Sequence, residues 1–165
     1  MIPILRYKSN LIPLSTKKPI YYIENKPDVF VKTFKIEDIN KMDNEFRIHT
    51  LASDIVNCPK LIDCYEEDYV GYFLMQRIDG KSLAELYGTE PKDIPKYIWK
   101  EIHSIIAKLY YKDIHYVDIT PYNFIIENDT KKLYIIDFGD AYVMKNNWFL
   151  KDFLDGENSW NSDFA

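Results

Sequence analysis

Two short stretches of the sequence place polar side chains between apolar runs. The stretch HYVDITPYNF carries Asp118 and Asn123, and LYIIDFGD carries Asp137. We expect the segments between them, NFIIEN and KLYIID, to pair as a hairpin around the turn DTKK. Carboxylate and amide oxygens gathered at one edge of this hairpin make a site suited to Mg²⁺, completed by substrate phosphates. Phosphoryl transfer needs such a site, together with an oriented acceptor hydroxyl and a cation on the phosphate oxygens.

Strands and one helix are predicted ahead of these motifs. PIYYIE and DVFVKTF are rich in β-branched and aromatic residues, and NKPD between them predicts a hairpin. A helix is predicted over KMDNEFRIHTLASDI, in which Met42, Phe46 and Leu51 recur at near-helical spacing and Glu45 lies on a neighbouring face. Two strands separated by an acidic turn follow in PKLIDCYEEDYVGYFLMQRI. These elements predict a mostly antiparallel sheet with one helix.

The composition changes near Gly80, which we take as a boundary within the chain. DIPKYIWKEIHSIIAKLYY predicts a long helix with one apolar stripe, and a short helix is expected near Trp148 to Leu154. We therefore predict an N-terminal lobe over 1–77 and a C-terminal lobe over 78–165, together forming a single domain. The stripe consists of Ile94, Ile98, Ile102, Ile105, Ile106 and Leu109.

Composition excludes several classes of function. The chain of 165 residues is 47% hydrophobic and 28% charged, which is typical of one globular domain. Its net charge of -5 gives no reason to expect nucleic acid or anionic lipid as a partner. No apolar run is long enough to span a bilayer, and MIPILRYKSN lacks the apolar core of a secretory signal, so a cytoplasmic location is expected. Cys58 and Cys64 are expected to be buried free thiols.

The motif from Asp118 to Asn123, followed by Asp137-Phe138-Gly139, resembles the catalytic loop and the DFG segment of the protein-kinase-like superfamily. VFVK resembles the strand motif that ends in the phosphate-binding lysine, here Lys32. Glu45 looks like the helix glutamate that pairs with this lysine, and FLMQRIDGKSL looks like the hinge. The resemblance implies an α+β fold of two lobes, with an antiparallel sheet and one helix in the first lobe and a much reduced, mainly helical second lobe.

The resemblance also implies roles for individual residues. Asp118 would be the catalytic base, and Asn123 and Asp137 would hold Mg²⁺. Lys32 would contact the α and β phosphates of ATP, with Glu45 holding it in place. The adenine would be bordered, mostly through backbone groups, by Met75, Gln76, Arg77 and Ile78.

The sequence departs from the usual protein-kinase pattern at several positions, and these departures indicate which kind of kinase it resembles. LSTKKPIYY has no glycine where a glycine-rich loop would approach the phosphates, and Lys17 and Lys18 are our candidates to supply charge there. The usual HRD reads Tyr116-Val117-Asp118, and Thr120 replaces the lysine of Ser/Thr protein kinases, which resembles the small atypical kinases of the KEOPS-complex and RIO type. No APE segment is recognised after DFG. Such small kinase-like proteins are expected in large DNA viruses, which would place the protein in the host cell.

The leading hypothesis is an ATP- and Mg²⁺-dependent phosphotransferase, a minimal atypical Ser/Thr protein kinase. One alternative is a pseudokinase-like binding module that regulates a partner protein, and another is a small-molecule kinase of the aminoglycoside or choline kinase type. The expected partner is a protein, either substrate or regulator, or a second copy bound through the reduced C-terminal lobe. His49 and His103 are assigned packing or surface roles.

Overall fold

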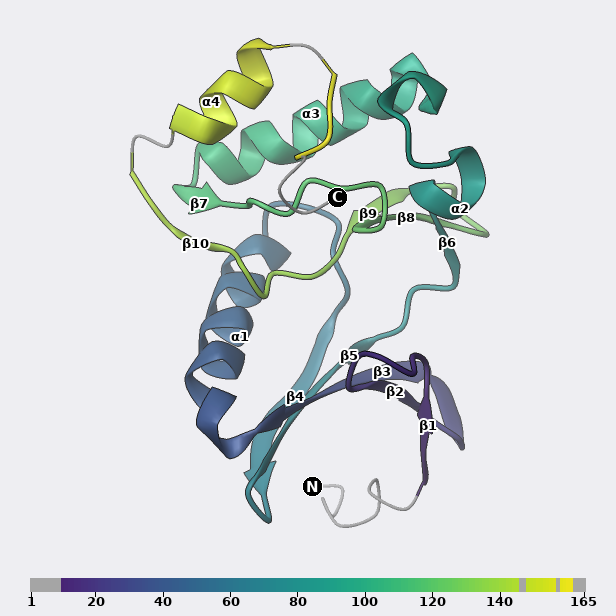
Figure 1. Cartoon of the computed structure of the whole chain (residues 1–165), viewed down its shortest axis with the longest axis vertical. Coiled ribbons are helices and arrows are strands. Elements are labelled where there is room, and N and C mark those ends of the chain that lie inside the picture. The colour runs from purple at the N-terminus through teal and green to yellow at the C-terminus, as the bar shows by residue number, and fades with distance from the viewer. Residues whose placement is uncertain (1–9, 146–147, 157, 162–165) are drawn as a thin grey trace.

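The computed structural model describes residues 10–145, 148–156 and 158–161. Across these residues, an antiparallel sheet and helix α1 occupy one end of the molecule, and α3 and α4 lie together at the other (Figure 1). The predicted α+β class, with an antiparallel sheet and few helices, is confirmed, and the sheet has five strands. In spatial order the sheet consists of β1 (Leu11–Pro13), β2 (Ile20–Ile23), β3 (Lys26–Lys35), β5 (Val70–Gln76) and β4 (Leu61–Glu67).

The predicted hairpins in this sheet are confirmed, but the first one turns earlier than predicted, because most of NKPD belongs to the second strand. β2 pairs antiparallel with β3, whose ladder already begins at Lys26, so the chain turns at residues 24–25. β4 and β5 form the second hairpin, and β5 also pairs with β3, placing Phe73 opposite Lys32. Successive β5 side chains alternate between the two faces of the sheet, and both faces are covered, since Tyr72 and Leu74 belong to one apolar cluster and Phe73 and Met75 to another. Residues 71–75 are therefore all buried. β3 is the middle strand of the sheet, and its pairing with β5 fixes the position of Lys32.

Helix α1 (Ile39–Ser53) follows a 3₁₀ turn and buries a face that the sequence pattern does not single out. Leu51, expected on the apolar face, is 46% exposed, whereas Glu45 and His49 are each 1% exposed. Met42 packs against the sheet with Phe73, as the pattern predicts. The polar face is buried because it lies against the segment after β9, where the Asn44 amide donates to the Ala141 carbonyl at 3.0 Å.

The second half of the chain is built around α3 (Lys96–Tyr110). The residues of the predicted apolar stripe are all buried, although Ile94 lies before the helix begins. The helix is shorter than predicted, because Pro95 lacks a backbone N–H and stands at its N-cap. β6 (Gly80–Ser82) and α2 (Leu83–Tyr87) were not predicted. α2 begins with a reciprocal capping box between Ser82 and Glu85, a signal present in the sequence. The predicted final helix is α4 (Trp148–Asp155), which lies beside α3 (Figure 1).

Four short strands bring the two polar motifs side by side. β7 (Ile114–His115) pairs with β10 (Tyr142–Val143), and β8 (Phe124–Glu127) pairs with β9 (Leu133–Ile135). The loop 116–123 connects β7 to β8, and the segment 136–141 connects β9 to β10. Since both ends of one connection are paired with both ends of the other, the two connections are held next to each other. The predicted hairpin around DTKK is confirmed, with β6 added as a third strand.

Other expectations have mixed outcomes. Cys58 and Cys64 are free, as predicted, but both are half-buried rather than buried. Among the described residues, no helix is long and apolar enough to cross a membrane. The division into lobes at 77 and 78 stays a prediction, although β5 ends at Gln76 and the next sheet begins at Gly80.

Candidate active site

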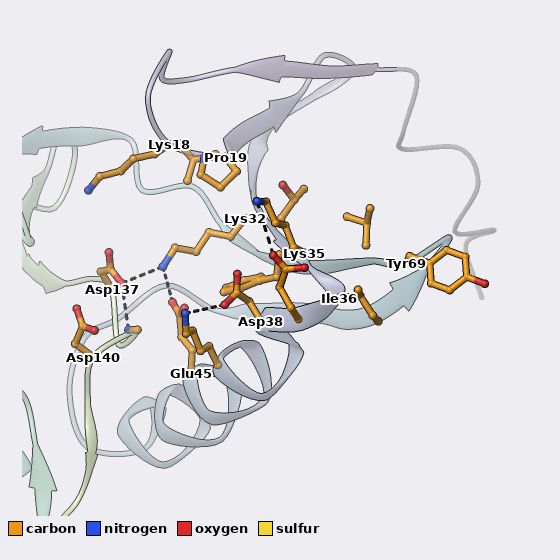
Figure 2. Close-up of a pocket in the computed structure, with 17 residues that line it drawn as sticks. Lys18, Pro19, Lys32, Lys35, Ile36, Asp38, Glu45, Tyr69, Asp137 and Asp140 are labelled. Atoms are coloured by element: carbon orange, nitrogen blue, oxygen red, sulfur yellow. Dashed lines mark hydrogen bonds and ion pairs between the residues drawn. The ribbon is translucent and has the colours of Figure 1, made fainter.

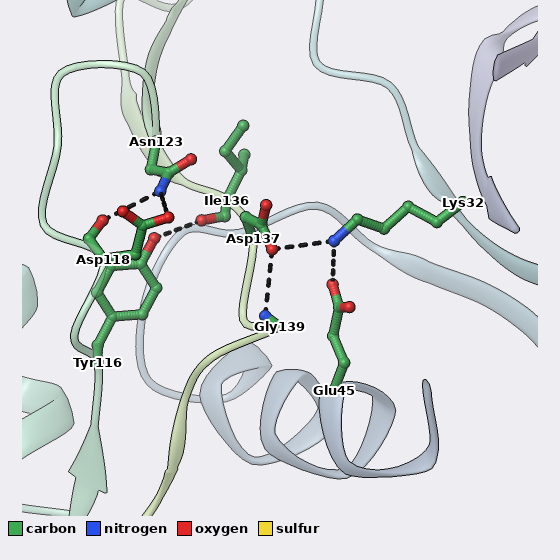
Figure 3. Close-up of polar contacts among 8 residues, drawn as sticks. All are labelled: Lys32, Glu45, Tyr116, Asp118, Asn123, Ile136, Asp137 and Gly139. Carbon is green, nitrogen blue, oxygen red and sulfur yellow. Dashed lines mark hydrogen bonds and ion pairs between the residues drawn. The ribbon is translucent and has the colours of Figure 1, made fainter. Parts of the chain in front are cut away.

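Lys32 lies between two carboxylates supplied by distant parts of the chain. Its Nζ is 2.7 Å from Oε1 of Glu45 on α1 and 2.9 Å from Oδ1 of Asp137, which follows β9 (Figures 2 and 3). Burial alone would lower the pKa of Lys32, but the Glu45 and Asp137 charges raise it above its ordinary value. Lys32 therefore remains cationic, and it ties the sheet, α1 and the second motif together.

Asp137 is held in an unusual backbone conformation. Its φ is 63°, in the left-handed region that aspartate tolerates better than most residues. Its Oδ1 also accepts a hydrogen bond from the Gly139 N–H at 3.1 Å. A Cβ on Gly139 would lie 3.1 Å from that oxygen and 3.5 Å from a Glu45 oxygen, so glycine leaves the room that this contact needs. Burial would raise the pKa of Asp137, but the Lys32 ammonium, the Gly139 N–H and the more distant Lys18 hold it below its usual value.

Asp118 and Asn123 form a second pair across from Lys32 (Figure 3). The Asn123 Nδ2 donates to the Asp118 backbone carbonyl at 3.0 Å and to its Oδ2 at 2.6 Å. The amide nitrogen thus faces Asp118, and the amide oxygen points to the other side. Burial raises the pKa of the Asp118 carboxyl, the Asn123 hydrogen bond opposes this, and the charges of Asp137 and Asp140 raise it further. A carboxylate with a raised pKa is a stronger base than an exposed aspartate.

Tyr116 joins the two motifs, a contact that the sequence reading missed. Its buried hydroxyl donates to the Ile136 carbonyl at 2.6 Å, and the Ile136 N–H donates to the Asn123 carbonyl at 2.9 Å. Both polar groups of Ile136, the residue before Asp137, are therefore fixed by the first loop. The available signal was a hydroxyl-bearing aromatic residue two positions before Asp118, between Ile114 and Val117.

An apolar cavity of about 440 Å³ opens next to these residues. Its inner end is formed by Lys32, Asn123 and Asp137, and its outer part by side chains of both halves of the chain. Asp118 is not among its lining residues and lies behind Asn123. A cavity of this size, with apolar side chains along its walls and polar groups that converge on it, is typical of small-molecule sites. The predicted hinge residues all line it: Met75, Gln76, Arg77 and Ile78.

The two lysines of the loop between β1 and β2 are placed differently. Lys18 lines the 440 Å³ cavity and a neighbouring one of about 680 Å³, and its side chain extends over the latter toward Asp137 (Figure 2). Lys17 lines neither cavity. The Ser15 hydroxyl oxygen accepts hydrogen bonds from the N–H groups of both lysines at 3.1 Å, which shapes a turn without glycine. The structure thus brings Lys18 to the site and leaves Lys17 outside.

We predict that Lys18→Ala weakens ATP affinity by about fivefold, since an exposed ion pair contributes up to about 1 kcal/mol. Lys17→Ala, the matched control on the same turn, is expected to leave ATP affinity unchanged. Isothermal titration calorimetry measures ATP binding to both variants, first in EDTA, which prevents turnover by removing Mg²⁺, and then with Mg²⁺. Unchanged affinity in the Lys17→Ala/Lys18→Ala double variant would contradict a phosphate-binding role for this turn.

His49 belongs to a buried column of rings beneath the site. Its ring centroid is 6.0 Å from that of Phe73 and 5.0 Å from that of Phe138, which in turn lies 5.5 Å from Tyr116. The His49 Nε2 donates to the Pro59 carbonyl at 2.7 Å, and the buried Nδ1 has no hydrogen-bond partner among the described residues. Burial lowers the pKa of His49, the Pro59 contact opposes this, and the Lys32 charge adds to the lowering. The packing role assigned to this histidine agrees with its contacts.

Acid is therefore expected to destabilise the protein through His49. Its pKa in the folded state lies below the value of about 6.5 for an exposed histidine, so below that pH the unfolded chain binds a proton that the native protein does not. The free energy of unfolding should fall as pH decreases from 7 to 5, and should fall less steeply in His49→Gln. Urea unfolding at several pH values measures both slopes, and equal slopes would contradict this origin of the acid sensitivity.

The donor set fits a metal that needs phosphate oxygens to complete its coordination. No group of three or more His, Cys, Asp or Glu side chains in the described part of the chain forms a metal site by itself. Asn123 and Asp137 offer one amide oxygen and one carboxylate on the same side of the cavity (Figure 3). Mg²⁺ commonly takes one or two protein oxygens and completes its shell with waters and substrate phosphates. These two residues are therefore suited to hold Mg²⁺ together with a nucleotide.

The structure has a kinase-type fold and site. Its helix α1 is ion-paired to the sheet, a cavity opens beside this ion pair, and two polar loops are held next to each other. The family model described as protein kinase domain matches residues 20–159, so the chain belongs to the protein kinase domain family. The chain is also similar to the EKC/KEOPS complex subunit BUD32 of Encephalitozoon cuniculi (strain GB-M1), with 29% identity over 90 residues.

These matches confirm the resemblance to atypical kinases at the level of the family. The alignment with the BUD32 relative covers 54% of this chain and 41% of the relative, so the chain spans less than half of the length of that protein. The protein kinase domain family is one of kinase-type phosphotransferases. The acceptor, the metal and the partner are the subject of the proposals below.

Proposed function

We propose that the protein is an ATP- and Mg²⁺-dependent phosphotransferase that acts on Ser or Thr hydroxyls of a protein. The observation that carries this proposal is the assembled polar set, in which Lys32 is fixed between Glu45 and Asp137 beside the paired Asp118 and Asn123. Lys32, Asn123 and Asp137 line the inner end of the 440 Å³ cavity, and Glu45 and Asp118 contact them from outside it. Phosphoryl transfer requires charged and polar groups gathered in this way around the phosphates.

Each residue has a stated task in the proposed reaction. The adenine lies in the cavity between the hinge and Ile125 and Ile136, and Lys32 donates hydrogen bonds to phosphate oxygens. Asp118 orients the acceptor hydroxyl and takes its proton as the hydroxyl oxygen bonds to the γ-phosphorus and the bond from that phosphorus to the β-phosphate oxygen breaks, releasing ADP. Asn123 and Asp137 hold Mg²⁺, which when bound neutralises charge on the phosphate oxygens.

Incubating the purified protein with γ-labelled ATP and a generic protein substrate tests the proposal. Label should appear on serine or threonine, require Mg²⁺, and disappear in Asp137→Ala. Label that survives Asp137→Ala would contradict the proposed role of this site. If millimolar ATP with Mg²⁺ gives no thermal stabilisation, the regulatory binding module becomes the better interpretation, because a ligand of the native state must stabilise it.

A protein partner is part of the proposal because the similar BUD32 protein is named as a subunit of a complex. Dimerisation through the C-terminal lobe and a cytoplasmic location stay predictions, and sedimentation analysis would test the first. Among the aromatic side chains of α4, Phe153 packs against His103 with ring centroids 4.7 Å apart, so it is occupied within the chain. The side chains of Trp148 and Phe149 lie outside the described residues.

A further inference from the structure

After α4, the chain returns to the loop that carries Asp118. Residues 158–161, which we call the C-terminal tail, cross α3 (Figure 1). The Trp160 ring lies 4.4 Å from the Trp99 ring of α3, measured between centroids, and packs against the main apolar core. The two rings are tilted by 37° to each other, and this contact fixes the position at which the next residue, Asn161, meets the loop.

Asn161 contacts the peptide groups on both sides of Asp118. Its backbone N–H donates to the Ile119 carbonyl at 2.9 Å, and its side-chain Nδ2 donates to the Val117 carbonyl. The same two loop residues are joined by a hydrogen bond from the Ile119 N–H to the Val117 carbonyl at 3.0 Å. The tail is therefore bound to the turn that contains Asp118 by two hydrogen bonds, both donated by Asn161.

Asp118 is consequently held from two directions. From within the loop, the Asn123 amide contacts both its carbonyl and its carboxylate. From the tail, Asn161 fixes the peptide planes before and after it, and these planes set the direction of its Cα–Cβ bond. The loop 116–123 lies between strands and lacks a continuous hydrogen-bonded ladder, so such contacts determine how far the carboxylate can move.

We propose that Asn161 is a positioning residue for Asp118, and that the C-terminal tail acts as a clamp on the catalytic loop. The inference rests on the proposed phosphotransferase function, in which Asp118 must meet the acceptor hydroxyl with a small tolerance in distance and angle. The residue does not touch the substrate in this scheme. It acts on the rate through the placement of Asp118.

The proposal is tested with Asn161→Leu, which keeps the size of the side chain but removes the amide that donates to Val117, and with Asn161→Asp, which replaces this donor by an acceptor. Both variants are expected to lower kcat about tenfold, because small misplacements of a catalytic group cost one to two orders of magnitude. KM for ATP should stay within about twofold of the parent value, since kcat and KM report different interactions, and Asn161 does not line the nucleotide cavity. Ser159→Ala, at an exposed position of the same tail, is the matched control and should behave as the parent protein.

A merely structural role for Asn161 would give a different result. Stability, ATP binding and rate would then fall together, and that outcome, or an unchanged kcat, would overturn the proposal. Trp160→Ala removes the anchor on Trp99 and should reproduce the loss in kcat, whereas Trp160→Phe, which keeps a ring there, should restore most of it.

Amide hydrogen exchange separates failure of the clamp from failure of the proposed function. In Asn161→Leu the Ile119 and Asn123 amides, which donate within the loop, should exchange faster than in the parent protein, while amides of β3 should not change. If the parent protein transfers no phosphate but this difference is seen, the clamp stands and the proposed function fails. If the parent is active and these amides exchange equally in both proteins, the clamp is overturned.

Discussion

Asp118→Asn is expected to lower kcat for phosphoryl transfer by about 100-fold or more, the usual contribution of a positioned general base. Asparagine has the same shape, and its side-chain oxygen can still accept the hydrogen bond that the Asn123 Nδ2 gives to Asp118 Oδ2 at 2.6 Å. The loop geometry should therefore persist while the ability to take a proton is lost. Because Asp118 does not line the nucleotide cavity, ATP affinity should change little.

The pH dependence of kcat provides a second measurement of the same residue. Burial raises the pKa of Asp118 above the ordinary aspartate value of 3.8 in spite of the Asn123 contact, so the active, deprotonated form is lost as pH falls through this raised pKa. The parent rate should show an acid limb above pH 3.8, and the limb should be absent from the residual rate of Asp118→Asn. Asp129→Asn, in the exposed turn between β8 and β9, is the matched control. An equal acid limb in the parent protein and in Asp118→Asn would assign the limb to another group.

The sequence alone predicted the elements whose pattern is local. The strands around Lys32, the hairpin between Asn123 and Asp137 and the long apolar stripe of α3 follow from alternation, turn residues and helical spacing, which act over a few residues. The order of the motifs along the chain then indicated which side chains converge. The structure brings Lys32, Glu45, Asn123 and Asp137 together, and their roles are the subject of the experiments above.

What the sequence did not predict depends on contacts between distant segments. The buried face of α1 was misassigned at Leu51 because hydrophobicity does not indicate that Glu45 and His49 face another part of the protein. The apolar pattern alone describes a helix on a sheet, whereas this helix also borders a charged site. A buried carboxylate on a helix is costly unless it is paired, so the pairing with Lys32 decides which face is inside.

The contacts of Asn161 could not be predicted from the sequence either. Nothing near it in the sequence suggests a contact with Val117, because the return of the chain depends on how α4 and Trp160 pack on α3. Lys17 and Lys18 were equivalent candidates in the sequence, and the turn around Ser15 separates them by directing only Lys18 to the two cavities. Two adjacent lysines can thus lie in different places because the backbone turn, and not the residue type, sets where each side chain points.

Lys32→Met is expected to abolish detectable phosphoryl transfer and to lower the free energy of unfolding by about 3–5 kcal/mol, the usual cost of breaking a buried ion pair from one side. The loss of stability arises because Glu45, whose side chain is 2% exposed, would keep its charge without the ammonium 2.7 Å away. Burial and the Asp137 charge already raise the pKa of Glu45 in spite of Lys32. The destabilisation should therefore shrink as pH decreases and Glu45 becomes protonated, which urea unfolding at several pH values would measure.

The double variant Lys32→Met/Glu45→Leu separates the two consequences. Replacing both members of a buried ion pair by apolar residues of similar size is often neutral for stability, so the double variant should regain most of the lost free energy of unfolding. It should remain inactive, because no ammonium faces Asp137 and the phosphate oxygens. Lys35→Met, on the same strand with a side chain 79% exposed, is the matched control and should change neither property. Recovery of activity in the double variant would show that Lys32 serves only to neutralise Glu45, and that another cation, such as Lys18, contacts the phosphates.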